Sequence, residues 1–458
     1  MNVERIVTLK KNQKEFFYSG KTKPYEFRVE QLKRLDGAIR AHETEILVAL
    51  KEDLKKSEAE AYVSEIAFLY EEIKFAIKNL KKWMKPKRVS TPLTQWPGRS
   101  YLYCEPLGVV LIIAPWNYPF QLVISPLIGA IAAGNCVVIK PSEISSSTSQ
   151  LIEQILTKIF AKDYISVVLG GKEISEELLK HSWDHLFFTG GTEVGRKVMM
   201  EASKTLTPVT LELGGKSPCI VDSDTDWKVT AKRIVWGKFF NAGQSCVAPD
   251  YLLLPKGSTE KFLPLLKITI EEFFTVAPEM SPDYGRIING NHYERLKKYL
   301  EEGNIAIGGK CNDKERFISP TILTETNWDQ EVMTQEIFGP ILPLMEYDSL
   351  EQVISWIQSR PKPLALYFFS NNKEKTREVL NRLSFGGGCI NDTLVHLANP
   401  KLPFGGVGES GIGSYHGEFS FDAFSHQKSV VKRAFWLDVA LRYPPYLNKI
   451  KFFRKVMR

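Results

Sequence analysis

Residues 106–139, PLGVVLIIAPWNYPFQLVISPLIGAIAAGNCVVI, carry no charged side chain. A run of more than ~20 apolar residues can cross a membrane as one helix. Pro115, Pro119 and Pro126 within the run argue against one continuous helix, because proline removes a backbone hydrogen bond. Parallel strands that are covered on both faces are equally apolar. We therefore expect a buried unit made of strand Val109–Ile113, a loop, a helix and strand Cys136–Ile139.

Strands and helices alternate beyond this unit. A helix is predicted over Ser145–Phe160, and segments typical of strands follow at Ile165–Leu169, His185–Phe188 and Val209–Leu213. This alternation predicts an open, doubly wound α/β sheet. The loops that follow its strands lie at the carboxyl edge of the sheet, where ligands bind in such folds.

A second alternating series begins after Gly214-Gly215. Its predicted elements are strands Cys219–Val221, Tyr251–Leu254, Ile341–Met345 and Leu364–Phe369, with helices over Trp227–Phe240 and from Ser258 onward. A chain of 458 residues is too long for one ordinary core, so more than one domain is expected. The predicted fold class is therefore α/β with two doubly wound domains.

The composition is that of a globular protein, with 43% apolar and 25% charged residues. The formal net charge of +7 is spread along the chain, so it does not single out nucleic acid as a partner. The first residues lack the uninterrupted apolar core of a signal peptide. The six cysteines lie far apart without a C-x-x-C pair, so we expect no metal site, no disulfide scaffold and a cytoplasmic location.

Cys246 lies in FFNAGQSCVAP, residues 239–249. A cysteine attacks a carbonyl as the thiolate, whereas a lone cysteine is more often a small buried apolar residue. Two other motifs favour the first interpretation: Glu212 in LELGGK supplies a carboxylate, and Asn117 in PWNYPF supplies an amide donor. A nucleophile, a base and a hydrogen-bond donor are the groups needed for acyl chemistry through a thioester.

A glycine-rich turn follows the strand HLFF and begins a helix. It consists of Gly190, Gly191, Thr192, Glu193, Val194 and Gly195. Its backbone could approach a pyrophosphate at the helix N-terminus, although it departs from G-x-G-x-x-G and could be only a tight turn. Lys140 and Glu143, at the end of a neighbouring strand, suit the ribose hydroxyls of a dinucleotide; alone they would indicate an ordinary helix start.

Two further segments have more than one interpretation. Residues 336–340, EIFGP, could be a turn with a buried ring, or could place the Glu336 carboxylate on a ribose and Phe338 against a nicotinamide. The tail LRYPPYLNKIKFFRKVMR is basic and aromatic, so it could rest on a membrane surface. A docked or mobile C-terminus is the alternative, and the tail is too short and charged to cross a bilayer.

Eight motifs occur together in one order: PWNYP, KPSE, FTGGTEVG, LELGGKSP, GQSCVAPDY, EIFGP, LPFGGVGESGIGSYHG and FSHQKSV. In these motifs the chain resembles the NAD(P)-dependent aldehyde dehydrogenases, and specifically the class 3 type that includes fatty-aldehyde enzymes. The resemblance covers nearly the whole length. The sequence departs from it at Gly191, where many relatives carry a polar residue, and at Glu409, where some carry Asn.

The resemblance implies an aldehyde dehydrogenase-like fold. Its parts would be a Rossmann-like cofactor domain (1–82 and 102–211), a catalytic domain (212–391), an oligomerisation element (83–101 and 392–428) and a C-terminal tail (429–458). It also implies a homodimer. Relatives anchored to membranes carry an apolar C-terminal helix that this sequence lacks, so we expect no transmembrane segment and at most peripheral membrane contact by the tail.

The resemblance also implies a mechanism. Cys246 would attack the aldehyde to give a thiohemiacetal, and the Asn117 amide and the Cys246 backbone N–H would hold the oxyanion. Hydride transfer to nicotinamide would leave a thioester, which Glu212 would hydrolyse by activating water. Family members that pass the acyl group to coenzyme A lack a base at the position of Glu212, so hydrolysis to the acid is expected here.

Cofactor contacts are implied residue by residue. Trp116, Lys140, Glu143 and the 190–195 turn would hold the dinucleotide, and Glu336 and Phe338 would hold its nicotinamide end. NAD is the expected cofactor and NADP remains possible. The expected substrates are medium- and long-chain aliphatic or aromatic aldehydes, with Tyr118, Phe240 and His396 as candidates for an apolar access channel. A binding or scaffold protein on an enzyme-like fold is the alternative of a different class.

Overall fold

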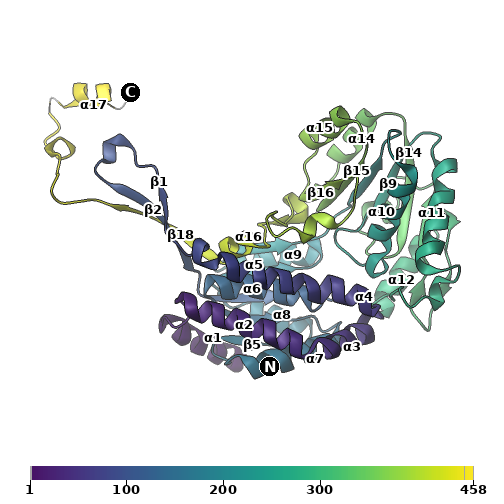
Figure 1. The fold of residues 1–458 in the computed structure, drawn as a ribbon, viewed down its shortest axis with the longest axis horizontal. Coiled ribbons are helices and arrows are strands. Elements are labelled where there is room, and N and C mark those ends of the chain that lie inside the picture. Colours follow the sequence, from purple (N-terminus) through teal and green to yellow (C-terminus); the bar gives the residue numbers. More distant parts are fainter. Residues whose placement is uncertain (1–2, 448, 457–458) are drawn as a thin grey trace.

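Two parallel β-sheets form the body of the protein, and a thin antiparallel arm extends away from it (Figure 1). The computed structural model describes residues 3–447 and 449–456. Residues 1–2, 448 and 457–458, which the expected cofactor domain and C-terminal tail include, lie outside the described residues. The paired α/β sheets confirm the predicted fold class.

The first sheet has the strand order β17-β7-β6-β3-β4-β5. Its strands are β3 (Val109–Ile113), β4 (Cys136–Lys140), β5 (Ile165–Val167), β6 (His185–Thr189), β7 (Val209–Glu212) and β17 (Gly411–Ile412). The sequence predicts all but β17, to within two residues at each end. β5 stops at Val167 rather than Leu169, because the chain turns away at Gly170, whose φ is 146°.

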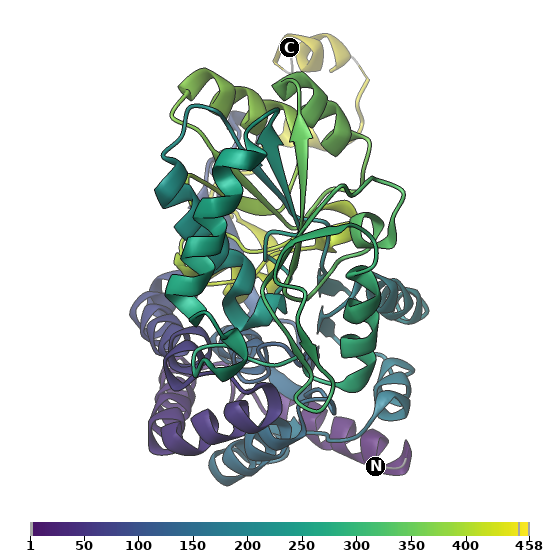
Figure 2. The ribbon, with the colours of Figure 1, turned by 90° about the vertical axis from the view of Figure 1, so that its right-hand side faces the viewer.

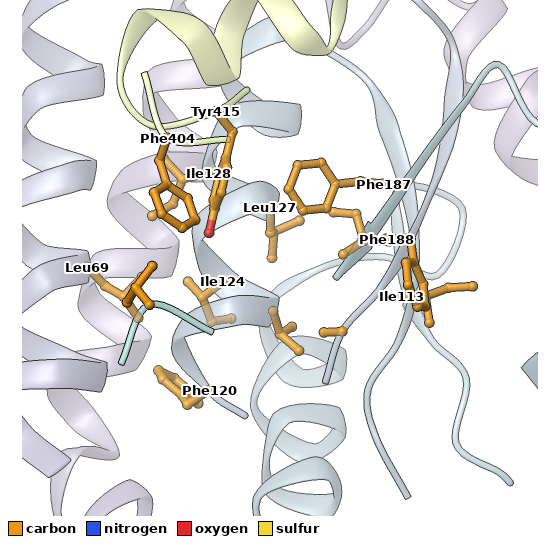
Figure 3. Packing of buried hydrophobic residues seen from close by; sticks show 14 of the residues in the cluster. Leu69, Ile113, Phe120, Ile124, Leu127, Ile128, Phe187, Phe188, Phe404 and Tyr415 are labelled. Carbon is orange, nitrogen blue, oxygen red and sulfur yellow. The ribbon is translucent and has the colours of Figure 1, made fainter. Parts of the chain in front are cut away.

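Helix α6 (Gln121–Ala133) is the centre of the first unit, since every one of its residues is buried. It packs against α2, α5, β3 and β4, which explains why residues 106–139 lack charge. Pro126 lies inside this helix, whereas Pro115 and Pro119 lie in the loop before it. The apolar run is therefore not one continuous helix. Figure 3 shows side chains of α6 packed with side chains of the strands and with Phe404 and Tyr415, which are distant in the sequence.

The other helices of this unit surround the sheet and α6. They are α1 (Val3–Tyr18), α2 (Tyr25–Ala41), α3 (Glu43–Leu54), α4 (Glu58–Ala61), a π-helix (Tyr62–Ala67), α5 (Phe68–Trp83), α7 (Ser146–Ile159), α8 (Lys172–Leu179) and α9 (Thr192–Ser203). Within the described residues, no helix has both the length and the apolar character needed to cross a membrane.

The second sheet has the order β10-β13-β14-β9-β8-β15-β16, with only β10 antiparallel to its neighbour. Figure 2 shows this unit, in teal and green, above the helices of the first. Its strands are β8 (Pro218–Val221), β9 (Tyr251–Pro255), β10 (Asn304–Ile307), β13 (Thr321–Thr324), β14 (Ile341–Tyr347), β15 (Ala365–Phe369) and β16 (Gly387–Ile390). Its helices are α10 (Trp227–Phe239), α11 (Thr259–Phe274), α12 (Gly290–Tyr299), α13 (Glu331–Thr334), α14 (Leu350–Gln358) and α15 (Lys373–Arg382), beside a small β11 (Cys311–Asn312) and β12 (Phe317–Ile318) pair.

After β16 the chain returns to the first unit. β17 joins the first sheet antiparallel to β7, and α16 (Glu418–Ala423) packs on α6. The Asn135 side chain donates a hydrogen bond to the carbonyl of Phe424 at 2.9 Å, which fixes the end of α16. The glycine-rich segment that follows β16 thus contains a short strand that completes the first sheet.

The arm is a three-stranded antiparallel sheet of β1 (Lys87–Val89), β2 (Arg99–Pro106) and β18 (Ser425–Lys432). β18 pairs with β2 from Ser425 opposite Pro106 to Lys432 opposite Arg99. Beyond β18 the chain continues away from the body to α17 (Ile450–Val456), shown in yellow in Figure 1. Phe435 and Trp436 are exposed on this stretch.

Candidate active site

The two sheets present opposite edges to each other. In the first sheet the candidate residues follow strands: Trp116 and Asn117 after β3, Lys140 at the end of β4, Gly190 after β6 and Glu212 at the end of β7. In the second sheet they precede strands: Cys246 before β9, and Glu336 and Phe338 before β14. The site therefore lies where the carboxyl edge of one sheet meets the amino edge of the other.

The loop that carries Cys246 is held in an unusual backbone conformation. Asn241, Ala242 and Gly243 have φ of 54°, 50° and 74°, all in the left-handed region. A Cβ on Gly243 would lie 2.2 Å from the carbonyl oxygen of Gly339, so only glycine lets this loop approach EIFGP so closely. The turn directs Cys246 into a cavity, through which the side chain is partly accessible.

Burial raises the pKa of the Cys246 thiol, and the nearby Glu336 and Glu212 carboxylates raise it further. The backbone N–H groups of Cys246 and Val247 act in the opposite direction. The thiol is therefore protonated at neutral pH in this state of the protein, and both carboxyl groups lie close enough to influence its charge.

Glu212 is placed at the end of β7 with a buried carboxyl group that is only 2% exposed. Neither carboxylate oxygen has a hydrogen-bond partner among the described residues. Burial raises the pKa of this carboxyl well above its usual range. An unpartnered buried carboxyl is costly for stability, so its retention next to a thiol is typical of a reactive site.

The Asn117 side chain joins the two edges. Its amide donates to the carbonyl of Gln244, two residues before Cys246, at 3.2 Å. Its backbone carbonyl accepts from Lys56 Nζ and from the Asn241 side chain, both at 2.9 Å. Because an amide group carries two hydrogens, one remains for a second acceptor beside Cys246.

Lys56 and Glu65 support this loop and were not found from the sequence. They form a fully buried ion pair. Glu65 also accepts from the backbone N–H groups of Phe120 at 2.9 Å and Gln121 at 3.1 Å, so the pair holds the PWNYPF loop at Asn117 and at its C-terminal end. Helical spacing could have indicated that Glu65 is buried, because Glu65 lies four residues before the buried Leu69 and therefore on the same face of the helix.

The EIFGP loop is anchored through its backbone. Arg295 donates to the carbonyl of Glu336 at 3.3 Å and of Ile337 at 2.7 Å, and the Ile337 N–H donates to Asp250 at 3.1 Å. Phe338 has a left-handed φ of 52°. Arg295 and Asp250 were also missed, because their partners are distant along the chain and the contacts are to backbone atoms.

Trp116 and Phe338 meet across the interface, with ring centroids 5.2 Å apart in a T-shaped arrangement. Glu336 Oε1 is buried without a partner among the described residues. Burial, followed by the charge of Asp250, raises the pKa of Glu336 to about 8. An unpartnered oxygen next to two aromatic rings can accept from a hydroxyl group of a ligand.

The 190–195 turn begins helix α9 at Thr192, and Gly191 at its N-cap provides no side-chain cap. Apart from Gly191 and its two chain neighbours, no described residue has an atom within 4 Å of the place where a Cβ of Gly191 would be, which leaves this side of the helix N-terminus open. A Cβ on Gly195 would lie 2.5 Å from Leu213 Cδ2, which shows that close packing of α9 on the strand below requires glycine here. The outer side chains of the turn, Glu193 and Val194, are exposed.

Lys140 and Glu143 contact each other, with Lys140 Nζ 3.0 Å from Glu143 Oε2. Lys140 is buried and also donates to the carbonyl of Pro141, whereas Glu143 is half-exposed. The strand order β6-β3-β4 places this pair two strands from the 190–195 turn on the same sheet edge.

The cavity at Cys246 has a volume of about 200 Å³ and a mainly apolar lining. Tyr118 and Phe240 line it as expected, together with Phe68, Trp236, Leu397 and Phe404. His396 lies outside the lining, with Nδ1 3.4 Å from Cys389 Sγ; His416 lines the cavity instead. The structure thus brings Glu212 and Glu336 close to Cys246, which lines the apolar cavity, and ties Asn117 to the Cys246 loop through Gln244.

A thiol, the unpartnered Glu212 carboxyl group, a Glu336 carboxyl group with one unpartnered oxygen and an amide donor are among the groups that nucleophilic acyl chemistry requires. Residues 3–430 match the aldehyde dehydrogenase family, and the chain belongs to this family. It is therefore an oxidoreductase that acts on aldehydes. The protein is an enzyme, and the alternative of a scaffold protein is wrong.

The chain is similar to proteins of the expected class. It is 50% identical over 445 residues to 4,4'-diaponeurosporen-aldehyde dehydrogenase of Staphylococcus aureus, covering 97% of each chain. It is 47% identical to aldehyde dehydrogenase family 3 member B1 of Rattus norvegicus, covering 95% of this chain and 94% of the other. A solved structure of Staphylococcus aureus AldH in a substrate-bound state superposes with a TM-score of 0.97, at 48% identity over 100% of both chains.

Proposed function

We propose that the protein oxidises medium- and long-chain aliphatic or aromatic aldehydes to carboxylic acids with NAD, and with NADP as an alternative. The observation that carries this proposal is the Cys246 thiol in an apolar cavity, near the Glu212 carboxyl group, whose two oxygens lack partners among the described residues, and near Glu336. An apolar cavity gains affinity from each buried methylene group of a substrate.

A dinucleotide fits the residues at the interface. The open N-terminus of α9 suits its pyrophosphate, and the unpartnered Glu336 oxygen suits a ribose hydroxyl. Trp116 and Phe338 would enclose the nicotinamide end, while Lys140 and Glu143 would hold the distant ribose. When bound, the cofactor supplies the hydride acceptor, and the protein supplies position and electrostatics.

The protein's own groups perform the remaining steps. Cys246 loses its proton and its sulfur forms a bond to the aldehyde carbon, while the Asn117 amide and the Cys246 N–H donate to the developing oxyanion. Such a donor typically contributes ~3 kcal/mol to lowering the barrier. After oxidation to the thioester, Glu212 removes a proton from water, which attacks the acyl carbon and releases the acid and the thiol.

We also propose that the protein is a cytoplasmic homodimer, in which the arm strands β1, β2 and β18 contact the partner. The arm extends away from its own body, as a dimerisation element would. The tail beyond it carries exposed aromatic residues, including Phe435 and Trp436, among basic side chains, which suits peripheral contact with an anionic membrane surface. Size determination in solution and vesicle cosedimentation test these two assignments.

The proposed activity is tested by NADH absorbance in a panel of aldehydes of increasing chain length, run with NAD and with NADP. We expect kcat/KM to rise with chain length until the cavity is filled, and the product to be the free acid. Absence of oxidation with every aldehyde, or release of product only when coenzyme A is added, would refute the proposal.

A further inference from the structure

His416 supplies an imidazole to the lining of the cavity beside Cys246. Among the other polar side chains of the lining, Ser64 donates to the carbonyl of Glu60 at 2.7 Å. Ser245 lies close enough to the Tyr118 hydroxyl group, and Gln121 to that of Tyr415, to lower the pKa of each hydroxyl. Neither ring nitrogen of His416 makes a hydrogen bond with any residue that the structure describes.

His416 is held firmly in this place. Its backbone N–H donates to Ser420 Oγ at 2.8 Å, at the start of α16. Its ring stacks on Phe404, with centroids 5.3 Å apart and an angle of 17°, and meets the edge of Tyr415 at 4.2 Å. The residue is only 4% exposed, so the ring faces the cavity rather than solvent. Figure 3 shows Phe404 and Tyr415 side by side above α6.

The backbone of His416 has a φ of 79°, in the left-handed region that non-glycine residues rarely adopt. Gly413 and Gly417 on either side are also left-handed, with φ of 88° and 55°. Strain of this kind persists where the surrounding structure enforces it, and it is frequent at ligand sites. The turn thus presents an imidazole to the cavity at a cost in stability.

The ring is neutral, because burial lowers the pKa of His416 to about 3. A neutral imidazole has one N–H donor and one bare acceptor nitrogen. The Leu397 carbonyl faces the ring closely enough to favour its protonated form, although hydrogen-bond geometry is not reached. A carbonyl can only accept, so it favours the tautomer whose N–H points to Leu397 and leaves the other nitrogen as an acceptor.

We propose that His416 is a specificity-determining residue that accepts a hydrogen bond from a hydroxyl group on the apolar part of the substrate. The favoured substrates are aldehydes that carry a hydroxyl group remote from the carbonyl on a medium or long apolar chain. The inference rests on the proposed aldehyde oxidation and adds a second recognition point to it. A plain alkanal has no donor and leaves the acceptor nitrogen of His416 unpaired. A hydroxylated aldehyde donates a hydrogen bond to this nitrogen and is therefore bound in preference to the alkanal.

The test compares three matched substrates at each chain length in the wild-type enzyme: an ω-hydroxyalkanal, the alkanal with a methyl group in place of the hydroxyl, and the ω-methoxyalkanal. We expect kcat/KM for the hydroxylated substrate to exceed the other two by about 5- to 10-fold at the matching length. The methoxy compound can accept but not donate, so it separates a hydrogen bond to an acceptor from a general preference for oxygen.

Variants assign the effect to this ring. In His416→Phe the ratio of kcat/KM for hydroxylated over plain substrate should fall to about one, and His416→Gln, which restores an acceptor oxygen, should recover part of it. The ratio is measured by competition in one mixture, so it does not depend on the fraction of folded enzyme. Ser64→Ala, which removes another polar group of the lining, should keep the wild-type ratio.

Two outcomes would overturn the proposal: no preference for the hydroxylated substrate at any chain length in the wild type, or a preference that survives in His416→Phe. In both cases oxidation of the plain alkanals would show that the proposed function itself stands. Failure of the proposed function would instead appear as no oxidation of any of the three substrates.

Discussion

The two parallel sheets use opposite edges for the same site. Glu212 ends β7 of the first sheet with both oxygens unpartnered among the described residues, whereas Asp222 follows β8 of the second with every contact satisfied. Asp222 accepts from Lys375 at 2.7 Å, Ser370 at 2.8 Å and the Ser223 N–H at 2.8 Å. The Glu212 carboxyl group at the edge of the first sheet is therefore left for a ligand, whereas the Asp222 carboxyl group at that of the second is already paired within the described residues.

This difference teaches that sheet topology alone does not locate a site. The rule that ligands bind at the carboxyl edge of a doubly wound sheet applies to the first sheet. Applied to the second, it would point to Asp222 and away from Cys246 and Glu336, which precede their strands. Buried polar atoms without partners indicate which of the two edges carries a site, whereas the topology of the sheets does not.

The largest effect is expected at the amino edge of the second sheet. Cys246→Ser should lower kcat/KM for aldehyde oxidation by more than about 10³-fold, because the hydroxyl group is a far weaker nucleophile here. Binding of NAD, followed by quenching of tryptophan fluorescence, should persist. The matched control is Cys311→Ser, which alters an exposed cysteine away from the interface and should leave activity unchanged. An active Cys246→Ser enzyme would remove the nucleophile assignment.

The next effect concerns the carboxyl edge of the first sheet. Glu212→Gln should reduce steady-state turnover by about 10²- to 10³-fold, because the water that hydrolyses the thioester loses its base. A rapid burst of NADH, close to one per active site, should remain in stopped-flow absorbance. Glu346→Gln is the matched control: this carboxylate lies near the end of β14 and accepts from Thr259, so turnover should be normal. Loss of the burst together with turnover would assign Glu212 a different role.

A smaller effect is expected from the charge across the interface. Ionised Glu336 raises the pKa of the Cys246 thiol, and Glu336 itself has a pKa of about 8. In Glu336→Gln, Cys246 should be alkylated at the wild-type rate at neutral pH, because the Glu336 carboxyl group of the wild type is mostly protonated there. Above pH 8 the wild-type carboxylate disfavours the Cys246 thiolate, so alkylation should be about 10-fold faster in the variant. Peptide mass spectrometry after iodoacetamide treatment measures this, with Cys311 as the internal reference. A slower reaction in the variant at high pH would contradict the assigned sign.

The smallest effect is expected at the carboxyl edge of the second sheet. Lys375→Met removes one partner of Asp222 and leaves those from Ser370 and Ser223. The thermal midpoint should fall by roughly a few degrees, since one charged hydrogen bond is lost, while kcat/KM stays at the wild-type value. A large loss of activity with unchanged thermal stability would show that this edge also serves the site and would end the contrast between the sheets.

Much of the fold could be predicted from local pattern. The central strands of the first sheet and strands β8, β9, β14 and β15 of the second are apolar enough to be recognised one by one, because each is covered on both faces. Strands β10, β13 and β16 of the second sheet were not predicted. The short strand β17 could not be, since two residues among glycines carry no periodicity and the strand exists only by pairing with β7. The arm was expected only from the family resemblance. Its strands β2 and β18 are more than about 300 residues apart in the sequence, so local pattern could not predict that they pair.

The candidate site was predictable where a motif carries the chemistry, and not where a residue acts on distant backbone. Cys246, Glu212 and Asn117 stand out by residue type and neighbours. Lys56 and Arg295 appear in the sequence as ordinary surface charges, because a charged residue is seldom buried. The catalytic roles and cofactor contacts remain predictions until the variants above are measured.

The return of the chain after β16 has a consequence for the order of synthesis. The sequences of the candidate nucleophile and base are both complete once the ribosome has passed residue 246, whereas Phe404, Tyr415 and His416, which line the cavity, are synthesised later. A nascent or truncated chain that ends before this wall would expose the thiol and the apolar face of α6 together. A protease that removes the segment from Phe404 onward would therefore open the cavity without touching the sulfur of Cys246.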